Sequence, residues 1–164
     1  IWRRCGQSEL ARMAGEQHIQ QHSAHQVSAA DRKFRAAFES GDWPTDAFDH
    51  AARIRLAYIY LCEQPVNSAQ ERIVQAIRGY LAHHGLPADK FHVTLTRAWM
   101  LAVHHFMAQS PPSRSAAAFL AANPRLRDSR IMLTHYSEAR LFSPDARSSF
   151  LAPDRQPIPT NEMC

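Results

Sequence analysis

Apolar side chains recur every three to four residues along most of the chain, which is the spacing of helices that bury one face. The apolar stripe predicted for the segment 45–63 consists of His50, Ile54, Ala57 and Leu61. The stripe predicted for the segment 68–84 consists of Ile73, Ala76, Ile77, Tyr80 and His84. The segment 89–109 is apolar nearly all round, so we expect it to be the central helix. Because no segment alternates like a strand, the pattern predicts an all-α fold.

Capping and helix-breaking residues set the expected bounds of four main helices. Ser28 with Asp31, and Ser68 with Glu71, have the spacing with which a side chain caps the first turn of a helix. Glycine followed within three residues by proline, as after Gly41 and Gly85, is typical of a helix end. Together with a cap at Thr45, these signals predict helices over 28–41, 45–63, 68–84 and 89–109.

The rest of the chain is expected to be shorter or less regular. Short helices are predicted over 115–122, 128–136 and 145–150. Residues 152–164 contain too many prolines for a helix or a central strand and are expected to lie extended. Residues 1–27 are rich in Gln, His, Ser and Arg, so we expect an arm in which His25 is solvated. The predicted regions are a weakly helical or disordered arm (1–27), a bundle of four main helices with short C-terminal helices (28–151), and an extended proline-rich tail (152–164).

The composition is that of one globular domain. Of the 164 residues, 45% are hydrophobic, 21% are charged and only five are glycine. The formal net charge is +4, but the arginines are spread along the chain, so a nucleic-acid partner is not expected. No apolar run approaches the roughly 20 residues of a membrane span, and the first residues lack the apolar stretch of a signal peptide. Three cysteines without a CxxC pair indicate no disulfide framework, so we expect a reduced, cytoplasmic protein with no membrane partner.

Three histidines are predicted to meet at one end of the bundle. Short loops make consecutive helices antiparallel neighbours, so the second, third and fourth helices should run up, down and up. His50 stands early in the second helix, His84 late in the third and His92 early in the fourth. Tyr80 and Trp99 stand on the same helices, close to these histidines. We therefore expect these five residues to line a ligand pocket.

Three interpretations of this pocket remain open at the level of the sequence. The three imidazoles could hold a divalent metal such as Zn or Fe, with a further ligand from Asp46, Asp89 or His135. They could instead line a polar pocket for a small organic molecule, or be structural residues that hydrogen-bond carbonyl groups near helix ends. The sequence has no HExxH motif, Glu-x-x-His pair, GxSxG elbow or glycine-rich phosphate loop, so no catalytic residue is assigned.

The leading functional hypothesis is a cytoplasmic protein of uncharacterised type that binds a metal ion or a small molecule in this pocket. The alternative is a non-catalytic interaction or assembly module, which would bury apolar surface in a homodimer through Trp43 or the C-terminal tail. Cys62 lies in an apolar helix and is expected to be an inert thiol. Arg55 lies among apolar residues, where it could reach solvent or pair with Asp49 or Glu63.

Two motifs resemble a family of uncharacterised bacterial helical-bundle proteins, a domain of unknown function. They are FDHAARIRLA at 48–57 and KFHVTLTRAW at 90–99, and the ending at 136–159 is also similar. In that family the first motif often has a second histidine at the position of Arg53, and the second often has glutamate at the position of Val93. The resemblance implies the same helical fold but no particular activity. Both differences replace residues that would be potential metal ligands in the family.

Overall fold

A computed structural model of the chain describes residues 24–160, and these residues form helices and turns with no β-strand. The four longest helices are α2 (Ala29–Ser40), α3 (His50–Glu63), α4 (Val66–His83) and α5 (Val93–Gln109). The prediction of an all-helical fold is therefore confirmed for this part of the chain. Most of the predicted arm (1–23) and the last four residues lie outside the described residues. None of the described helices is both long and apolar enough to cross a lipid bilayer.

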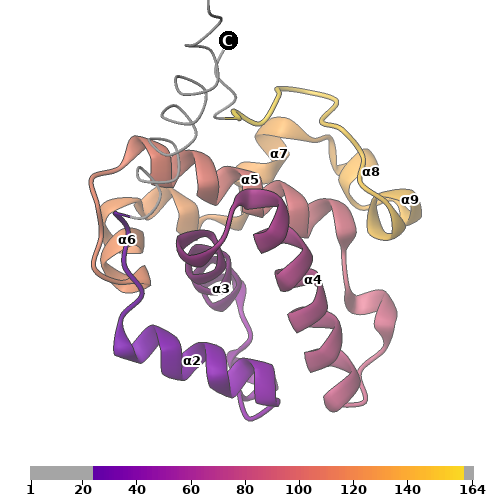
Figure 1. Cartoon of the computed structure of the whole chain (residues 1–164). Helices are drawn as coiled ribbons and strands as arrows, with labels where there is room; N and C mark the ends of the chain where they lie inside the picture. Colours follow the sequence, from indigo (N-terminus) through magenta and orange to yellow (C-terminus); the bar gives the residue numbers. More distant parts are fainter. Residues whose placement is uncertain (1–23, 161–164) are drawn as a thin grey trace, which may run out of the picture.

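The long helices cross one another rather than lying parallel as in the predicted bundle. Figure 1 shows α3 nearly end-on, while α2 and α5 run across the view on either side of it and α4 descends beside it. Helix α3 packs against α2, α4, α5 and α6. Its residues 56–61 are buried in an unbroken run, which is why its sequence shows little difference between faces. The central helix is thus α3, whereas the sequence pattern pointed to the segment that forms α5.

Several helix ends differ from the predicted ones. The cap of α2 is as expected, because Ser28 and Asp31 form a reciprocal capping box and Gly41 ends the helix with a φ of 85°. Helix α4, however, begins at Val66, two residues before Ser68, so the predicted capping box is not used. The expected fourth helix is split by a short 3₁₀ turn (Ala88–Lys90), and α5 begins only after His92.

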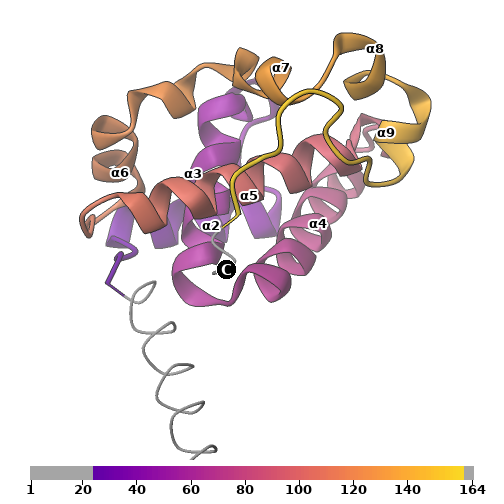
Figure 2. The ribbon, with the colours of Figure 1, turned by 90° about the horizontal axis from the view of Figure 1, so that it is seen from above.

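Short helices and turns follow α5 and cover one of its sides (Figure 2). They are α6 (Ala116–Ala122), two 3₁₀ turns (Pro124–Arg127 and Ser129–Ile131), α7 (Met132–His135), α8 (Glu138–Leu141) and α9 (Pro144–Ser148). Residues 151–160 contain no helix and pass over α5 in Figure 2. Hydrogen bonds from Arg155 N–H to the His135 carbonyl (2.9 Å) and from Ser137 N–H to Asp154 (2.8 Å) fasten this segment to α7 and α8.

A buried polar junction joins the start of the described chain to the loop after α5. His25 is 4% exposed, so the expectation that it is solvated is wrong. The Ser113 N–H donates to His25 Nδ1 (3.1 Å), and His25 Nε2 lies 2.9 Å from the Met107 carbonyl oxygen. Because Nδ1 accepts, the proton sits on Nε2, which donates to that carbonyl. Gln26 N–H also donates to the Ser113 carbonyl (2.8 Å), which ties the two segments together.

Asp31 is the charged member of this junction and is 1% exposed. Its carboxylate accepts hydrogen bonds from the Ser28 N–H (3.1 Å), the Ala116 N–H (3.0 Å) and Arg55 Nε (2.9 Å). Burial alone would raise the pKa of Asp31, but these hydrogen bonds together lower it below its ordinary value. Arg55 thus pairs with an acid on α2 and not with Asp49 or Glu63, the partners predicted from the sequence. We use "polar junction" below for His25, Asp31, Arg55, Ser113 and Ala116.

Candidate functional site

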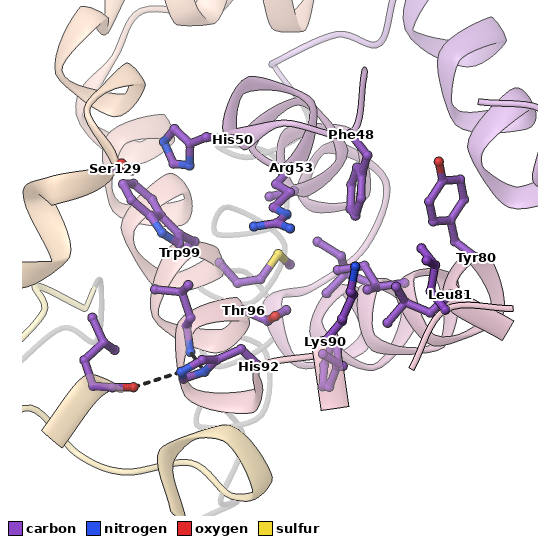
Figure 3. A pocket seen from close by; sticks show the side chains of 18 of the residues that line it. Phe48, His50, Arg53, Tyr80, Leu81, Lys90, His92, Thr96, Trp99 and Ser129 are labelled. Carbon is purple, nitrogen blue, oxygen red and sulfur yellow. Dashed lines mark hydrogen bonds between the residues drawn. The ribbon is translucent and has the colours of Figure 1, made fainter. Parts of the chain in front are cut away.

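A cavity of about 540 Å³ lies between α3, α4 and α5 and is bounded on another side by the segment from Ser129 to Phe142. This volume is in the range of small-molecule sites. We call it the main cavity (Figure 3). Most of its lining is apolar or aromatic. The lining residues are Thr45, Phe48, His50, Arg53, Ala57, Ile73, Ile77, Tyr80, Leu81, Leu86, Lys90, Phe91, His92, Leu95, Thr96, Trp99, Met100, Ser129, Arg130, Leu133, Leu141 and Phe142.

The charged side chains that line the main cavity are all cations, namely Arg53, Lys90 and Arg130. Arg130 is neutralised by Asp128, with Nε and Oδ1 2.9 Å apart. Arg53 and Lys90 form no ion pair or hydrogen bond with any described residue, and both project into the cavity in Figure 3. The Arg53 guanidinium carbon lies 5.0 Å from the centroid of the Phe48 ring, which holds the side chain by a cation–π contact. The main cavity therefore offers two cations whose charge is not neutralised by a carboxylate in its wall.

His92 is buried in the wall of the main cavity, where both of its nitrogens are used by the fold. Its Nδ1 accepts the Leu95 N–H (3.1 Å), so the ring caps the N-terminus of α5. The proton is consequently on Nε2, which donates to the Leu141 carbonyl 2.8 Å away. Burial is the main cause that lowers the pKa of His92 below its ordinary value, which keeps the ring neutral at pH 7. His92 fastens α8 to the start of α5 and has no nitrogen lone pair left for a metal.

His50 lies on the opposite side of the cavity, at the start of α3. Its Nε2 is 2.8 Å from the Leu126 carbonyl oxygen, to which it donates. The ring meets the indole of Trp99 edge-on, with centroids 4.5 Å apart. These two contacts hold Trp99 and the 3₁₀ turn at 124–127 in place against α3. His50 and Trp99 are thus part of a fixed wall.

His84, the third predicted histidine, does not line the main cavity. It follows α4 and packs against the ring of Tyr80, with centroids 4.5 Å apart. Its Nε2 is buried and has no hydrogen-bond partner among the described residues. Tyr80 does line the cavity, but its hydroxyl donates to the Trp43 carbonyl (2.6 Å). Of the five predicted ligand-binding residues, the structure brings His50, His92, Tyr80 and Trp99 to one cavity and leaves His84 behind Tyr80.

The predicted three-histidine metal centre is not assembled. Within residues 24–160, no group of three or more His, Cys, Asp or Glu residues is placed so that it could hold a metal ion. His84 lies outside the cavity and both nitrogens of His92 are engaged, so two of the three predicted ligands are lost. His135, offered as a further ligand, is 2.9 Å from the Gln156 carbonyl through its Nδ1. The described residues therefore do not support a metal ion at this site.

Sequence reasoning missed the two unneutralised cations. Arg53 stands three residues after His50, so both lie on the same face of α3, and this spacing could have indicated it. Lys90 is in the 3₁₀ turn before α5, where helix periodicity does not predict which way a side chain points. Phe142 at the edge of the cavity was also missed, and it is 59% exposed.

Two other predicted features have structural roles. Trp43, suggested as a homodimer contact, is half-buried. Its Nε1 donates to the Ala47 carbonyl (3.1 Å), and its ring meets Phe34 edge-on. Burial raises the pKa of the Cys62 thiol to about 12, so the group is protonated at neutral pH, as expected of an inert cysteine. Neither residue contributes to the main cavity.

The chain matches no protein-family model, no curated protein and no solved structure to which it was compared. The resemblance of its two motifs to a bacterial helical family therefore stays a prediction. The shape and the lining of the main cavity are the observations that bear on function.

Proposed function

We propose that this protein binds a small organic anion with an apolar body in the main cavity. The observation that carries the proposal is the pairing of apolar walls with Arg53 and Lys90, two cations whose side chains form no salt bridge or hydrogen bond with any described residue. Both residues are exposed, so water accepts their hydrogen bonds until a bound anion replaces that water as the acceptor. A ligand carboxylate or sulfonate would supply that acceptor, and the planar guanidinium suits a two-point contact with either group.

The walls favour an apolar body attached to the anionic group. Phe48, Trp99 and Leu133 lie on three different elements around the cavity, so a flat ring between them would be covered from several sides. An aromatic ring buries roughly 150–250 Å². At about 25 cal/mol per Å² this gives about 4–6 kcal/mol before the cost of association is subtracted. Affinity in the micromolar range is expected once the charge contact is included.

Binding is better supported than catalysis or assembly. Among the cavity residues that could move a proton, His92 has both nitrogens engaged, His50 donates through Nε2 to the Leu126 carbonyl, and the Tyr80 hydroxyl donates to a backbone carbonyl. A homodimer would need an exposed apolar surface, and among the described residues Phe142 is the large hydrophobic side chain that is exposed. Phe142 borders the main cavity, so its exposure is also what a ligand entrance requires.

The test uses anilinonaphthalene sulfonate, a fluorescent probe with an anionic group on an apolar body. The wild-type protein should raise the fluorescence of this probe with saturable, one-site behaviour, and naphthoate should displace it. The double variant Arg53→Gln/Lys90→Gln should weaken binding at least tenfold, because both charge contacts are lost.

A matched control distinguishes binding in the main cavity from a general effect of the protein's net charge. Lys33→Gln/Arg114→Gln removes the same two charges from exposed positions outside the cavity, and it should bind the probe as the wild type does. If both double variants lose affinity equally, long-range charge explains binding and the proposal is wrong. The same conclusion follows if the wild-type protein binds neither compound. Melting curves recorded by circular dichroism must show that each variant is folded, because the probe also binds partly unfolded proteins.

A further inference from the structure

A second cavity of about 660 Å³ adjoins the main cavity on the side of α4 and α5. The two cavities share three lining residues, Ile73, Thr96 and Met100. The wall between them is thus formed by side chains of α4 and α5 and is one side chain thick. Thr96 is visible in Figure 3 at the back of the main cavity, between Arg53 and Lys90. Arg53, Lys90 and the three shared residues thus line the same cavity.

Met100 is the movable part of this wall. It is fully buried, but its side chain is unbranched and has three rotatable bonds, so it can change conformation at low cost. Ile73 is branched and Thr96 is short, and neither can clear or block the wall as Met100 can.

Part of the lining of the second cavity, beyond the shared wall, is apolar. Val74, Val93 and Phe150 line the second cavity and do not line the main one. Arg97 stacks on the Phe150 ring, 4.3 Å from its centroid, and helps to hold that ring over the cavity. The remaining lining positions are polar or charged, so an apolar chain would lie against Val74, Val93 and Phe150 and away from them. They are Asn67, Gln70, Glu71, Gln75 and Arg78.

We infer that the ligand of the main cavity is a straight-chain carboxylate whose chain passes Met100 into the second cavity. This inference rests on the proposed function and adds the shape of the ligand to it. The carboxylate would lie between Arg53 and Lys90, and the first methylenes along Thr96. The end of the chain would lie against Val74 and Val93.

The experiment compares hexanoate with dodecanoate by displacement of anilinonaphthalene sulfonate. Each methylene that becomes buried contributes about 0.8 kcal/mol, which is about a fourfold gain in affinity. Dodecanoate should therefore bind the wild-type protein at least tenfold more tightly than hexanoate. Val74→Trp fills the second cavity from a half-buried position and leaves the main cavity intact. It should remove the gain of dodecanoate while hexanoate and naphthoate bind as before, which also shows that the variant is folded.

Val66→Trp is the matched control, because it makes the same change at a half-buried position on α4 outside both cavities. It should keep the preference for dodecanoate. The inference is overturned if the wild type binds both chain lengths equally, or if the two tryptophan variants behave alike. In either case, binding of hexanoate and naphthoate would leave the proposed function standing. Failure of every carboxylate to bind the wild type would instead remove the proposed function, and the inference with it.

Discussion

The polar junction and the main cavity both gather charged and imidazole side chains, but the junction buries Asp31 and His25, whereas Arg53 and Lys90 at the cavity are exposed. In the junction, Asp31 accepts three hydrogen bonds and both nitrogens of His25 are engaged. In the cavity, the side chains of Arg53 and Lys90 form no salt bridge or hydrogen bond with a described residue, although Arg53 lies over the Phe48 ring. A charge that holds a fold together must have its partners in the fold, because an unpaired buried charge is costly. A charge that recognises a ligand must keep its partner positions open until the ligand binds.

The largest expected effect is the loss of stability when the polar junction is broken. Asp31→Ala should lower the free energy of unfolding by roughly 3 kcal/mol, because it leaves Arg55, the buried Ala116 N–H and the half-buried Ser28 N–H without an acceptor. Chemical denaturation at pH 7 measures this loss. Asp46→Ala, at an exposed position, should change the same quantity by less than about 0.5 kcal/mol. A loss below about 1 kcal/mol for Asp31→Ala would show that the junction is not a structural lock.

The second-largest expected effect is on the pH dependence of the free energy of unfolding, to which His92 contributes. Its pKa in the folded protein is below the ordinary 6.5, so the unfolded chain takes up a proton first as the pH falls. The stabilisation by neutral His92 is therefore complete above pH 6.5 and decreases as the pH falls from 6.5 through the lowered value. His92→Asn keeps an oxygen that can cap α5 but cannot titrate, so unfolding free energies measured from pH 7.5 to 5 should fall less steeply.

His83→Asn is the control for this experiment, because His83 is exposed at the end of α4. It should leave the pH dependence of the wild type unchanged. Equal slopes for wild type and His92→Asn would mean that the neutral ring of His92 does not stabilise the fold.

The smallest expected effect on stability is on the cavity side. Arg53→Gln/Lys90→Gln should change the free energy of unfolding by less than about 1 kcal/mol, because neither cation has an ion pair to lose and Arg53 loses only its contact with the Phe48 ring. Chemical denaturation of this variant and of Lys33→Gln/Arg114→Gln should give equal values within error. A loss of 2 kcal/mol or more would place Arg53 or Lys90 with the structural charges and erase the contrast between the two regions.

Local sequence signals predicted local structure well where one side chain meets its own backbone. The capping box of Ser28 and Asp31 and the left-handed Gly41 both follow from rules that act within four residues. The start of α5 was misplaced because His92 caps it, and imidazole is not one of the usual capping side chains. The start of α4 was misplaced because Pro65 already allows the helix to begin before Ser68.

The site was only partly predictable because it is built across long distances in sequence. His50 is held by the carbonyl of Leu126, and His92 by that of Leu141. No periodic pattern indicates such backbone partners, which require the C-terminal segment to fold over α5. The assumption of parallel helices grouped His84 with the other two histidines. In the structure, His84 instead packs against the Tyr80 ring and does not line the cavity.

The most direct measurement is a crystal structure of the protein with naphthoate. The account predicts the rings of naphthoate inside the main cavity beside Trp99, with the carboxylate within hydrogen-bond distance of the Arg53 guanidinium and close to Lys90. Naphthoate bound at another surface while the cavity between α3 and α5 stays without it would contradict the account.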